Sequence, residues 1–183
     1  MGFYWVKLLI LKFPTQNERL WFIVVVCLRH YLRWLTSFTY LVASSAIADG
    51  SLCDRLASVE ADPHRKEPGV TYDNIVGVRV IEACLKALKT EPENARYWLQ
   101  LGRGYLKEDR GADMMDAFKR SESFGYPAAT FALAVVYHTG NGISGSDPYK
   151  AELLYKDAYR SGIGYAAMGL TRLYDEVGSP FFD

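Results

Sequence analysis

Cysteine and histidine are the side chains with which this sequence could perform nucleophilic or metal chemistry. The chain has three of each, and none of them form the spacings H-E-x-x-H or C-x-x-C that hold a metal ion. The phosphate-binding pattern G-x-x-x-x-G-K-[ST] does not occur either. We therefore predict neither a metal ion nor a cofactor. One pair stays open for nucleophilic catalysis, because Cys84 and His138 could act as nucleophile and base if the fold brought them together.

The N-terminal residues have the composition of a targeting segment. An apolar run, Leu20–Leu28, precedes a basic stretch that starts at Arg29. A second apolar run then ends in the sequence Ala-Ile-Ala, which has the A-x-A order of a signal-peptide cleavage site and closes at Ala48. This order predicts that residues 1–48 are a signal peptide and that the protein is periplasmic or secreted. The alternative is an uncleaved anchor over residues 20–48 that holds the protein in the membrane, facing the periplasm.

Export changes the interpretation of the cysteines. Cys27 would leave with the leader, so Cys53 and Cys84 would remain as an even pair in an oxidising compartment. We predict a disulfide between them, and the alternative is two buried thiols. A disulfide would consume the thiolate that a catalytic pair of Cys84 and His138 needs. The sequence therefore favours a protein that is not an enzyme.

The charge of the body of the chain disfavours nucleic acid as a partner. The first 48 residues hold five of the 21 basic side chains but only one of the 21 acidic ones. The rest of the chain is therefore mildly acidic, and it contains no run of Lys or Arg that could follow a phosphate backbone. We predict that the protein does not bind nucleic acid and that it touches a membrane only through residues 20–48, if these are retained.

The remaining chain has the apolar period of helices. Residues 49–71 contain prolines, a glycine and alternating charges, so we predict a non-repeating linker there. Asp73 or Asn74 can cap a first helix that ends before Pro92. Its apolar stripe is predicted to consist of Ile75, Val78, Ile81, Leu85 and Leu88. Further helices are predicted over residues 94–107, 113–123, 128–138, 148–161 and 165–176, which makes an all-α chain.

Two stretches of this helical region repeat each other. The segment from Gly125 to Tyr137 and the segment from Gly162 to Tyr174 match without a gap, with Ala129 equivalent to Ala166 and Leu133 equivalent to Leu170. The identities recur every four residues, which places them along one drifting helix face. Small residues on such a face let neighbouring helices approach closely. We infer that the chain stacks similar helix pairs, because one pair cannot bury its apolar stripe alone.

The repeated residues resemble a known family. The run Phe118–Ser121, the residues Gly125, Ala129, Leu133 and Tyr137, and the turn around Gly140–Gly142 are similar to Sel-1-like repeats, which are α-solenoid relatives of tetratricopeptide repeats. The resemblance implies an α-solenoid of stacked antiparallel helix pairs over residues 72–183. Its units would cover about 72–92, 93–127, 128–164 and 165–183, and the last unit is incomplete because its second helix is missing.

The resemblance also implies where a partner binds. In tetratricopeptide arrays the first helices of the pairs line a concave groove that holds a protein or an extended peptide. Carried over to this sequence, the side chains that would line that groove are Arg96, Arg103, Lys107, His138, Tyr165, Arg172 and Asp175.

The function that follows is an exported, non-enzymatic protein that mediates protein–protein or protein–peptide interaction, with a regulatory or scaffold role in the cell envelope. One alternative is a fragment of a longer repeat protein that carries an enzymatic domain. A second alternative is a scaffold that stays anchored in the membrane.

Overall fold

The computed structural model describes residues 52–176 and 180–181. These residues belong to one compact unit that spans residues 46–183. The leader or anchor predicted for residues 1–48 lies outside the described residues. Among the residues described, no helix is both long enough and apolar enough to cross a bilayer.

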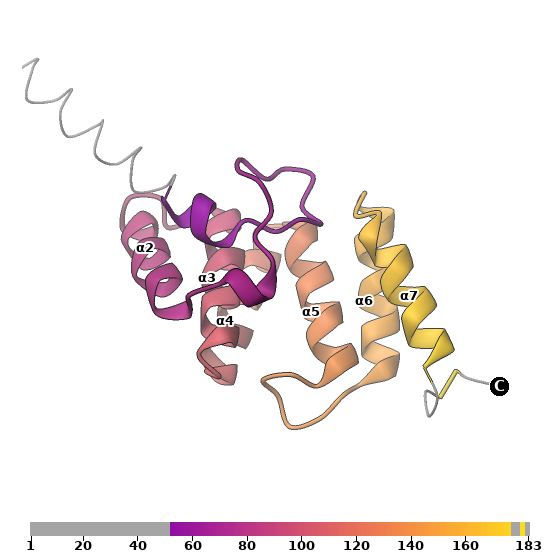
Figure 1. Ribbon diagram of the computed structural model, residues 1–183. Coiled ribbons are helices and arrows are strands. Elements are labelled where there is room, and N and C mark those ends of the chain that lie inside the picture. Colours follow the sequence, from indigo (N-terminus) through magenta and orange to yellow (C-terminus); the bar gives the residue numbers. More distant parts are fainter. Residues whose placement is uncertain (1–51, 177–179, 182–183) are drawn as a thin grey trace, which may run out of the picture. The chain divides into compact units, whose positions relative to one another are not determined.

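The described part of the chain is helical and contains no strand, which confirms the all-α prediction. Residues 52–57 are helical, and an irregular stretch with turns and bends then leads to a short 3-10 helix. The helices that follow can be traced in order in Figure 1; they are η1 (Tyr72–Asn74), α2 (Gly77–Thr90), α3 (Ala95–Lys107), α4 (Gly111–Ser123), α5 (Pro127–Thr139), α6 (Pro148–Arg160) and α7 (Tyr165–Asp175).

Proline and glycine set several of these helix ends. Pro127 and Pro148 occupy the first turns of α5 and α6, where the missing N–H costs nothing and the fixed φ suits a helix. The carboxylate of Asp147 accepts a hydrogen bond of 3.0 Å from the backbone N–H of Lys150, which caps α6. Gly140 ends α5 with a φ of 73°, a conformation that glycine adopts without strain. The ends of α5, α6 and α7 accordingly fall within one residue of the predicted ranges.

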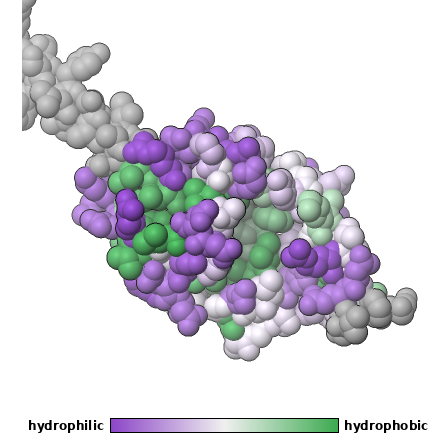
Figure 2. Space-filling model, in the orientation of Figure 1, coloured by the Kyte–Doolittle hydropathy of each residue, from purple (hydrophilic) through white to green (hydrophobic). Residues whose placement is uncertain are grey.

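The prediction for the first helix was wrong in its start and in part of its buried face. Asp73 belongs to η1, and α2 begins at Gly77. Val78 and Leu85, predicted as core, are 62% and 42% exposed. The residues of α2 that are buried are Gly77, Val80, Ala83, Cys84, Ala87 and Leu88. Apolar residues follow one another at steps of three and four on both faces of α2. The small residues determine which face is buried, because they allow the closer contact with a neighbouring helix. The resulting apolar surface near α2 is visible in Figure 2.

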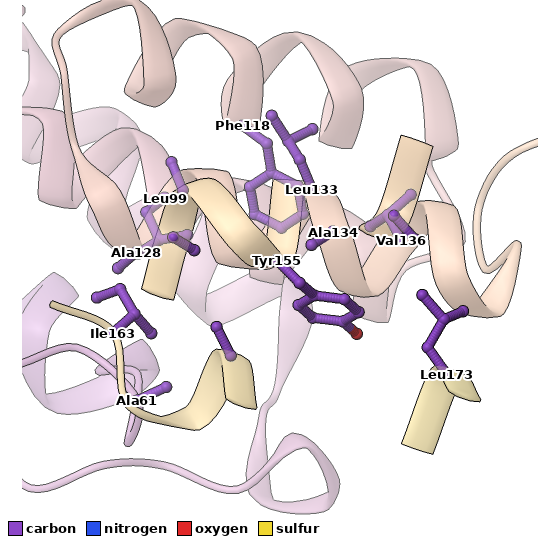
Figure 3. Packing of buried hydrophobic residues seen from close by; sticks show 14 of the residues in the cluster. Ala61, Leu99, Phe118, Ala128, Leu133, Ala134, Val136, Tyr155, Ile163 and Leu173 are labelled. Atoms are coloured by element: carbon purple, nitrogen blue, oxygen red, sulfur yellow. The ribbon is translucent and has the colours of Figure 1, made fainter. Parts of the chain in front are cut away.

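Each helix packs against the next one along the chain. Contacts join α2 to α3, α3 to α4, α4 to α5, α5 to α6 and α6 to α7. Alternate helices also touch, since α3 contacts α5 and α5 contacts α7. Figure 3 shows Leu133, Ala134 and Tyr155 in the middle of the larger buried cluster, with Ala61 and Ile163 towards one end and Leu173 towards the other. The helices α3, α5 and α7 therefore form neighbouring parts of one surface.

The segment before η1 is packed onto the helices. Cys53 and Cys84 form a disulfide with an S–S distance of 2.00 Å, which confirms the predicted pairing. Cys53, Asp54 and Ala57 are buried, as are Ser58, Ala61 and Asp62. Residues 54–72 therefore form part of the folded unit, and we call them the N-terminal segment below.

Candidate functional site

The side chains predicted to line a concave groove fall into two groups. Arg96, Arg103 and Lys107 project from α3 and contact the N-terminal segment. The other four are His138, Tyr165, Arg172 and Asp175, which surround cavities next to α7. The structure thus brings each group together but separates the two groups along the row of helices.

Arg103 binds the backbone of the N-terminal segment. Its Nη1 donates hydrogen bonds to the carbonyl oxygens of Ala57, at 2.9 Å, and Ser58, at 2.7 Å. Its Nη2 donates a third to the carbonyl of Val70, at 2.6 Å. Burial lowers the pKa of Arg103 to about 10, so the guanidinium stays charged at neutral pH and its N–H groups are satisfied by main-chain oxygens. These contacts are made to main-chain carbonyl oxygens and not to a particular side chain.

Arg96 and Lys107 fix the two ends of the same segment. Arg96 Nε lies 2.7 Å from Asp54 Oδ1, and Gln100 Nε2 donates to the same oxygen at 2.8 Å. Lys107 Nζ donates to the carbonyl of Tyr72 at 3.3 Å and lies 4.6 Å from the centre of its ring. The face of α3 that was predicted to bind a partner is therefore occupied by the protein's own chain.

The N-terminal segment also reaches the start of α5. The Tyr126 hydroxyl donates a hydrogen bond to Asp62. Burial, and then this hydrogen bond, raise the pKa of Tyr126 above its usual value. Ala61 joins Ala128 of α5 and Ile163, which precedes α7, in one buried cluster. The segment thus covers the row of helices from α3 as far as the N-terminal end of α5.

A cavity remains on the described part of α5, α6 and α7, and we call it the α5–α7 pocket. Its volume is about 620 Å³. It is lined by Phe131, Val135, His138, Thr139, Ser146, Tyr155, Tyr165, Met168, Gly169, Arg172 and Glu176. Three of the predicted groove residues, His138, Tyr165 and Arg172, are therefore part of one pocket.

A chain of hydrogen bonds crosses the pocket. The Nδ1 of His138 lies 3.1 Å from the hydroxyl oxygen of Tyr155, and its Nε2 lies 2.9 Å from Glu176 Oε2. Burial raises the pKa of Tyr155 to about 12, so the phenol keeps its proton at neutral pH. Because the phenol can donate to Nδ1 and a carboxylate oxygen accepts, we assign the tautomer in which Nε2 donates to Glu176. The His138 side chain is 6% exposed, whereas that of Glu176 is 59% exposed.

The walls of the pocket are apolar and aromatic. The rings of Phe131 and Tyr155 pack with their centres 5.9 Å apart. Gly169 leaves room for the Tyr155 ring, since a Cβ at this position would lie 2.4 Å from the Cε1 atom. Tyr165 and Met168 are large side chains of α7 that stay exposed at the pocket. The pocket thus combines a hydrophobic lining with a few polar atoms, as binding sites for peptides and small molecules do.

Arg172 carries a positive charge at the mouth of the pocket. It lines the α5–α7 pocket and also a neighbouring cavity of about 590 Å³ that contains Asp175 and Glu176. Its charge lowers the pKa of Tyr155 slightly against the larger effect of burial. No hydrogen bond or ion pair of Arg172 is formed with any residue that the structure describes.

Sequence reasoning missed three important members of the pocket, Phe131, Tyr155 and Glu176. Cys84 and His138, considered as a catalytic pair, lie in different parts of the fold, and Cys84 is bonded to Cys53. Within the described ranges no three His, Cys, Asp or Glu side chains are grouped so that they could hold a metal ion.

Comparisons of the chain with protein-family models, with curated proteins and with solved structures find no match.

Proposed function

We propose that this chain is an exported helical-repeat protein that binds a protein or an extended peptide at the α5–α7 pocket. The observation that carries this proposal is the contact between α3 and the N-terminal segment. Arg103 already holds main chain there, through the carbonyl oxygens of Ala57, Ser58 and Val70. The α5–α7 pocket belongs to the same series of alternate helices, and the described residues leave it open.

The internal repeat supports an α-solenoid of the Sel-1-like kind. Ala129 of α5 and Ala166 of α7 are equivalent in the repeat, and both are fully buried. Gly125 and Gly162 precede these helices with φ values of 71° and 92°. The contacts of α3 with α5 and of α5 with α7 are those of the first helices in stacked pairs. A stack of this type presents an extended binding surface.

The disulfide supports export. Bonds of this kind persist in the periplasm and outside the cell, whereas the cytosol keeps thiols reduced. Cys53 and Cys84 join the N-terminal segment to α2. We place the protein in the bacterial periplasm or in the secreted fraction, with a regulatory or scaffold role in the cell envelope.

Affinity capture from envelope extract tests the proposal. The bait is tagged residues 49–183, compared with an Arg172→Glu variant of the pocket and an Arg160→Glu variant of the exposed face of α6. A retained protein is then purified and its direct binding is measured. We expect a partner that binds the wild type and the Arg160→Glu variant but not the Arg172→Glu variant. A folded bait whose purified partners bind all three proteins equally would contradict the proposed site.

A further inference from the structure

We infer that the α5–α7 pocket recognises a carboxylate of an extended peptide, and that Glu176 occupies the position of that carboxylate in the absence of ligand. This inference rests on the proposed function and adds the chemistry of the partner. It follows from three features of the pocket: a buried N–H donor, a guanidinium that pairs with none of the described residues, and a weakly held internal carboxylate.

The first feature is the imidazole of His138. It is buried except for a few per cent of its side chain, and its Nε2 points at a carboxylate oxygen 2.9 Å away. Nδ1 is held by Tyr155 at 3.1 Å, which fixes the ring orientation. A buried donor that loses its acceptor is costly. His138 Nε2 therefore requires an acceptor, and any group that removes Glu176 has to supply one.

The second feature is Arg172. It lines the same pocket and has no ion-pair partner among the residues described. A guanidinium donates in a planar fork that fits both oxygens of a carboxylate. Together with His138 Nε2 it supplies more donors than Glu176 alone uses. An incoming carboxylate can therefore gain contacts that the internal one does not make.

The third feature is the way in which Glu176 is attached. It directly follows the end of α7, with extended dihedral angles of −75° and 122°. Its side chain is 59% exposed, and among the described residues it forms a hydrogen bond with His138. The Glu176 carboxylate is largely hydrated, so it loses little when it leaves His138, provided that another acceptor takes its place. Glu176 can therefore leave His138 without disturbing α7.

The apolar walls define the rest of the ligand. Phe131 and Val135 on α5 face Tyr165 and Met168 on α7 across the pocket. These side chains offer contact area to an apolar or aromatic residue next to the carboxylate. The ligand chemistry is thus a carboxylate with a hydrophobic neighbour, which a peptide provides either at its C-terminus or at an Asp or Glu side chain.

Fluorescence anisotropy with four labelled hexapeptides tests the inference on protein purified from cells that express the full chain. All four are built from alanine, serine and phenylalanine. The first has a free C-terminal carboxylate, the second a C-terminal amide and one internal Glu, the third an amide and no acid, and the fourth an amide and one internal Lys. We expect the first or second peptide to bind at least about tenfold more tightly than the third. The comparison of the first two identifies the source of the carboxylate.

Variants locate the interaction. Arg172→Ala is expected to weaken the preferred peptide about tenfold, whereas Arg160→Ala, a matched change on the exposed face of α6, leaves it unchanged. Glu176→Gln is expected to tighten peptide binding several-fold, because a neutral amide competes less well for His138. Asp157→Asn, which also neutralises a carboxylate but lies outside the pocket, serves as its control. Binding of the carboxylate peptide should also shift the ring-nitrogen resonances of His138.

Each other result overturns the inference. Preference for the Lys peptide, with weaker binding in the Glu176→Gln variant, would mean that the pocket takes a cation. If all four peptides bind equally and Tyr165→Ala reduces their binding, the proposed function stands, but the pocket does not recognise a carboxylate. If none of the peptides binds a folded protein that still captures its partner, the carboxylate is excluded and the partner binds by another chemistry.

Discussion

Arg96 and Asp54 form a buried ion pair that holds the N-terminal segment on α3, with Nε–Oδ1 and Nη2–Oδ2 distances of 2.7 and 3.2 Å. The Asp54 side chain is 5% exposed. Removing one partner of a buried pair leaves the other charge uncompensated. We expect Asp54→Asn to lower the free energy of unfolding by about 3 kcal/mol, measured by urea denaturation.

Asp157 provides the control for this prediction. It pairs with Arg160 at the same distance of 2.7 Å, but its side chain is 62% exposed. Exposed pairs contribute little, so Asp157→Asn should change the stability by no more than about 0.5 kcal/mol. Equal effects of the two substitutions would show that the N-terminal segment does not depend on the buried pair.

The disulfide should contribute more than any single hydrogen bond of the N-terminal segment. It closes a loop with a sequence separation of 31 residues, for which the loop-entropy model gives about 3 to 4 kcal/mol. We expect a Cys53→Ala/Cys84→Ala double variant to lose this amount in urea denaturation. Thiol titration of the denatured, unreduced protein checks the bond itself, and two free thiols per chain in residues 49–183 would exclude it.

The small residues of the repeat should be intolerant of larger side chains. Ala166 is fully buried and lies at the equivalent position to Ala129. Ala166→Leu should cost about 1 to 3 kcal/mol, because extra methylene groups overpack a filled core. Ala167→Leu, one residue further along α7 and exposed, is the matched control and should leave the melting temperature nearly unchanged. A tolerated Ala166→Leu would contradict the close packing of α7 described above.

Gly169 is expected to be required for the pocket. A Cβ on this residue would lie 2.4 Å from Tyr155 Cε1, and the ring would have to move. We predict that Gly169→Ala destabilises the protein by about 1 to 3 kcal/mol and shifts the aromatic resonances of Tyr155. Gly164→Ala tests the specificity of the effect, since a Cβ there meets no atom within 4 Å, and this variant should be as stable as the wild type or slightly more stable.

Tyr155 should make stability depend on alkaline pH. Its pKa is raised from 10.0 to about 12 in the folded protein, mainly by burial. Below the unfolded value the phenol is protonated in both states. Between the two values the unfolded chain loses its proton first, so the free energy of unfolding falls as the pH rises. Between about pH 9 and about pH 11 the wild type should lose about 1 kcal/mol more than Tyr155→Phe, and parallel losses would show that Tyr155 is not responsible.

The positions of the helices could be predicted because local signals define them. Pro127, Pro148 and Gly140 mark ends that tertiary packing does not change, and the four-residue spacing from Ala129 to Leu133 identifies a helix face. The face of α2 could not be predicted in the same way. Val78 and Leu85 continue an apolar period as well as Val80 and Cys84 do, and the choice depends on how α2 packs against α3 and against the residues around Cys53.

The site was predicted in part. His138, Tyr165 and Arg172 were assigned to one face from the resemblance, and they line one pocket. The binding role of Arg96, Arg103, Lys107 and Asp175 stays a prediction. A helix period places the three α3 side chains on one face but does not show what covers that face, since this depends on a segment about 40 residues earlier. No sequence pattern marked Glu176, because only a long-range contact with His138 brings it to the pocket.

The N-terminal segment has a further consequence for any ligand of α3. Because residues 54–72 are tethered to the surface on which they lie, they compete there at an effective concentration in the millimolar range or above. The bond between Cys53 and Cys84 shortens the tether and raises this concentration. A free peptide at micromolar concentration would have to bind α3 about a thousandfold more tightly than the segment does. Under the proposed function, ligand binding is therefore confined to the α5–α7 pocket.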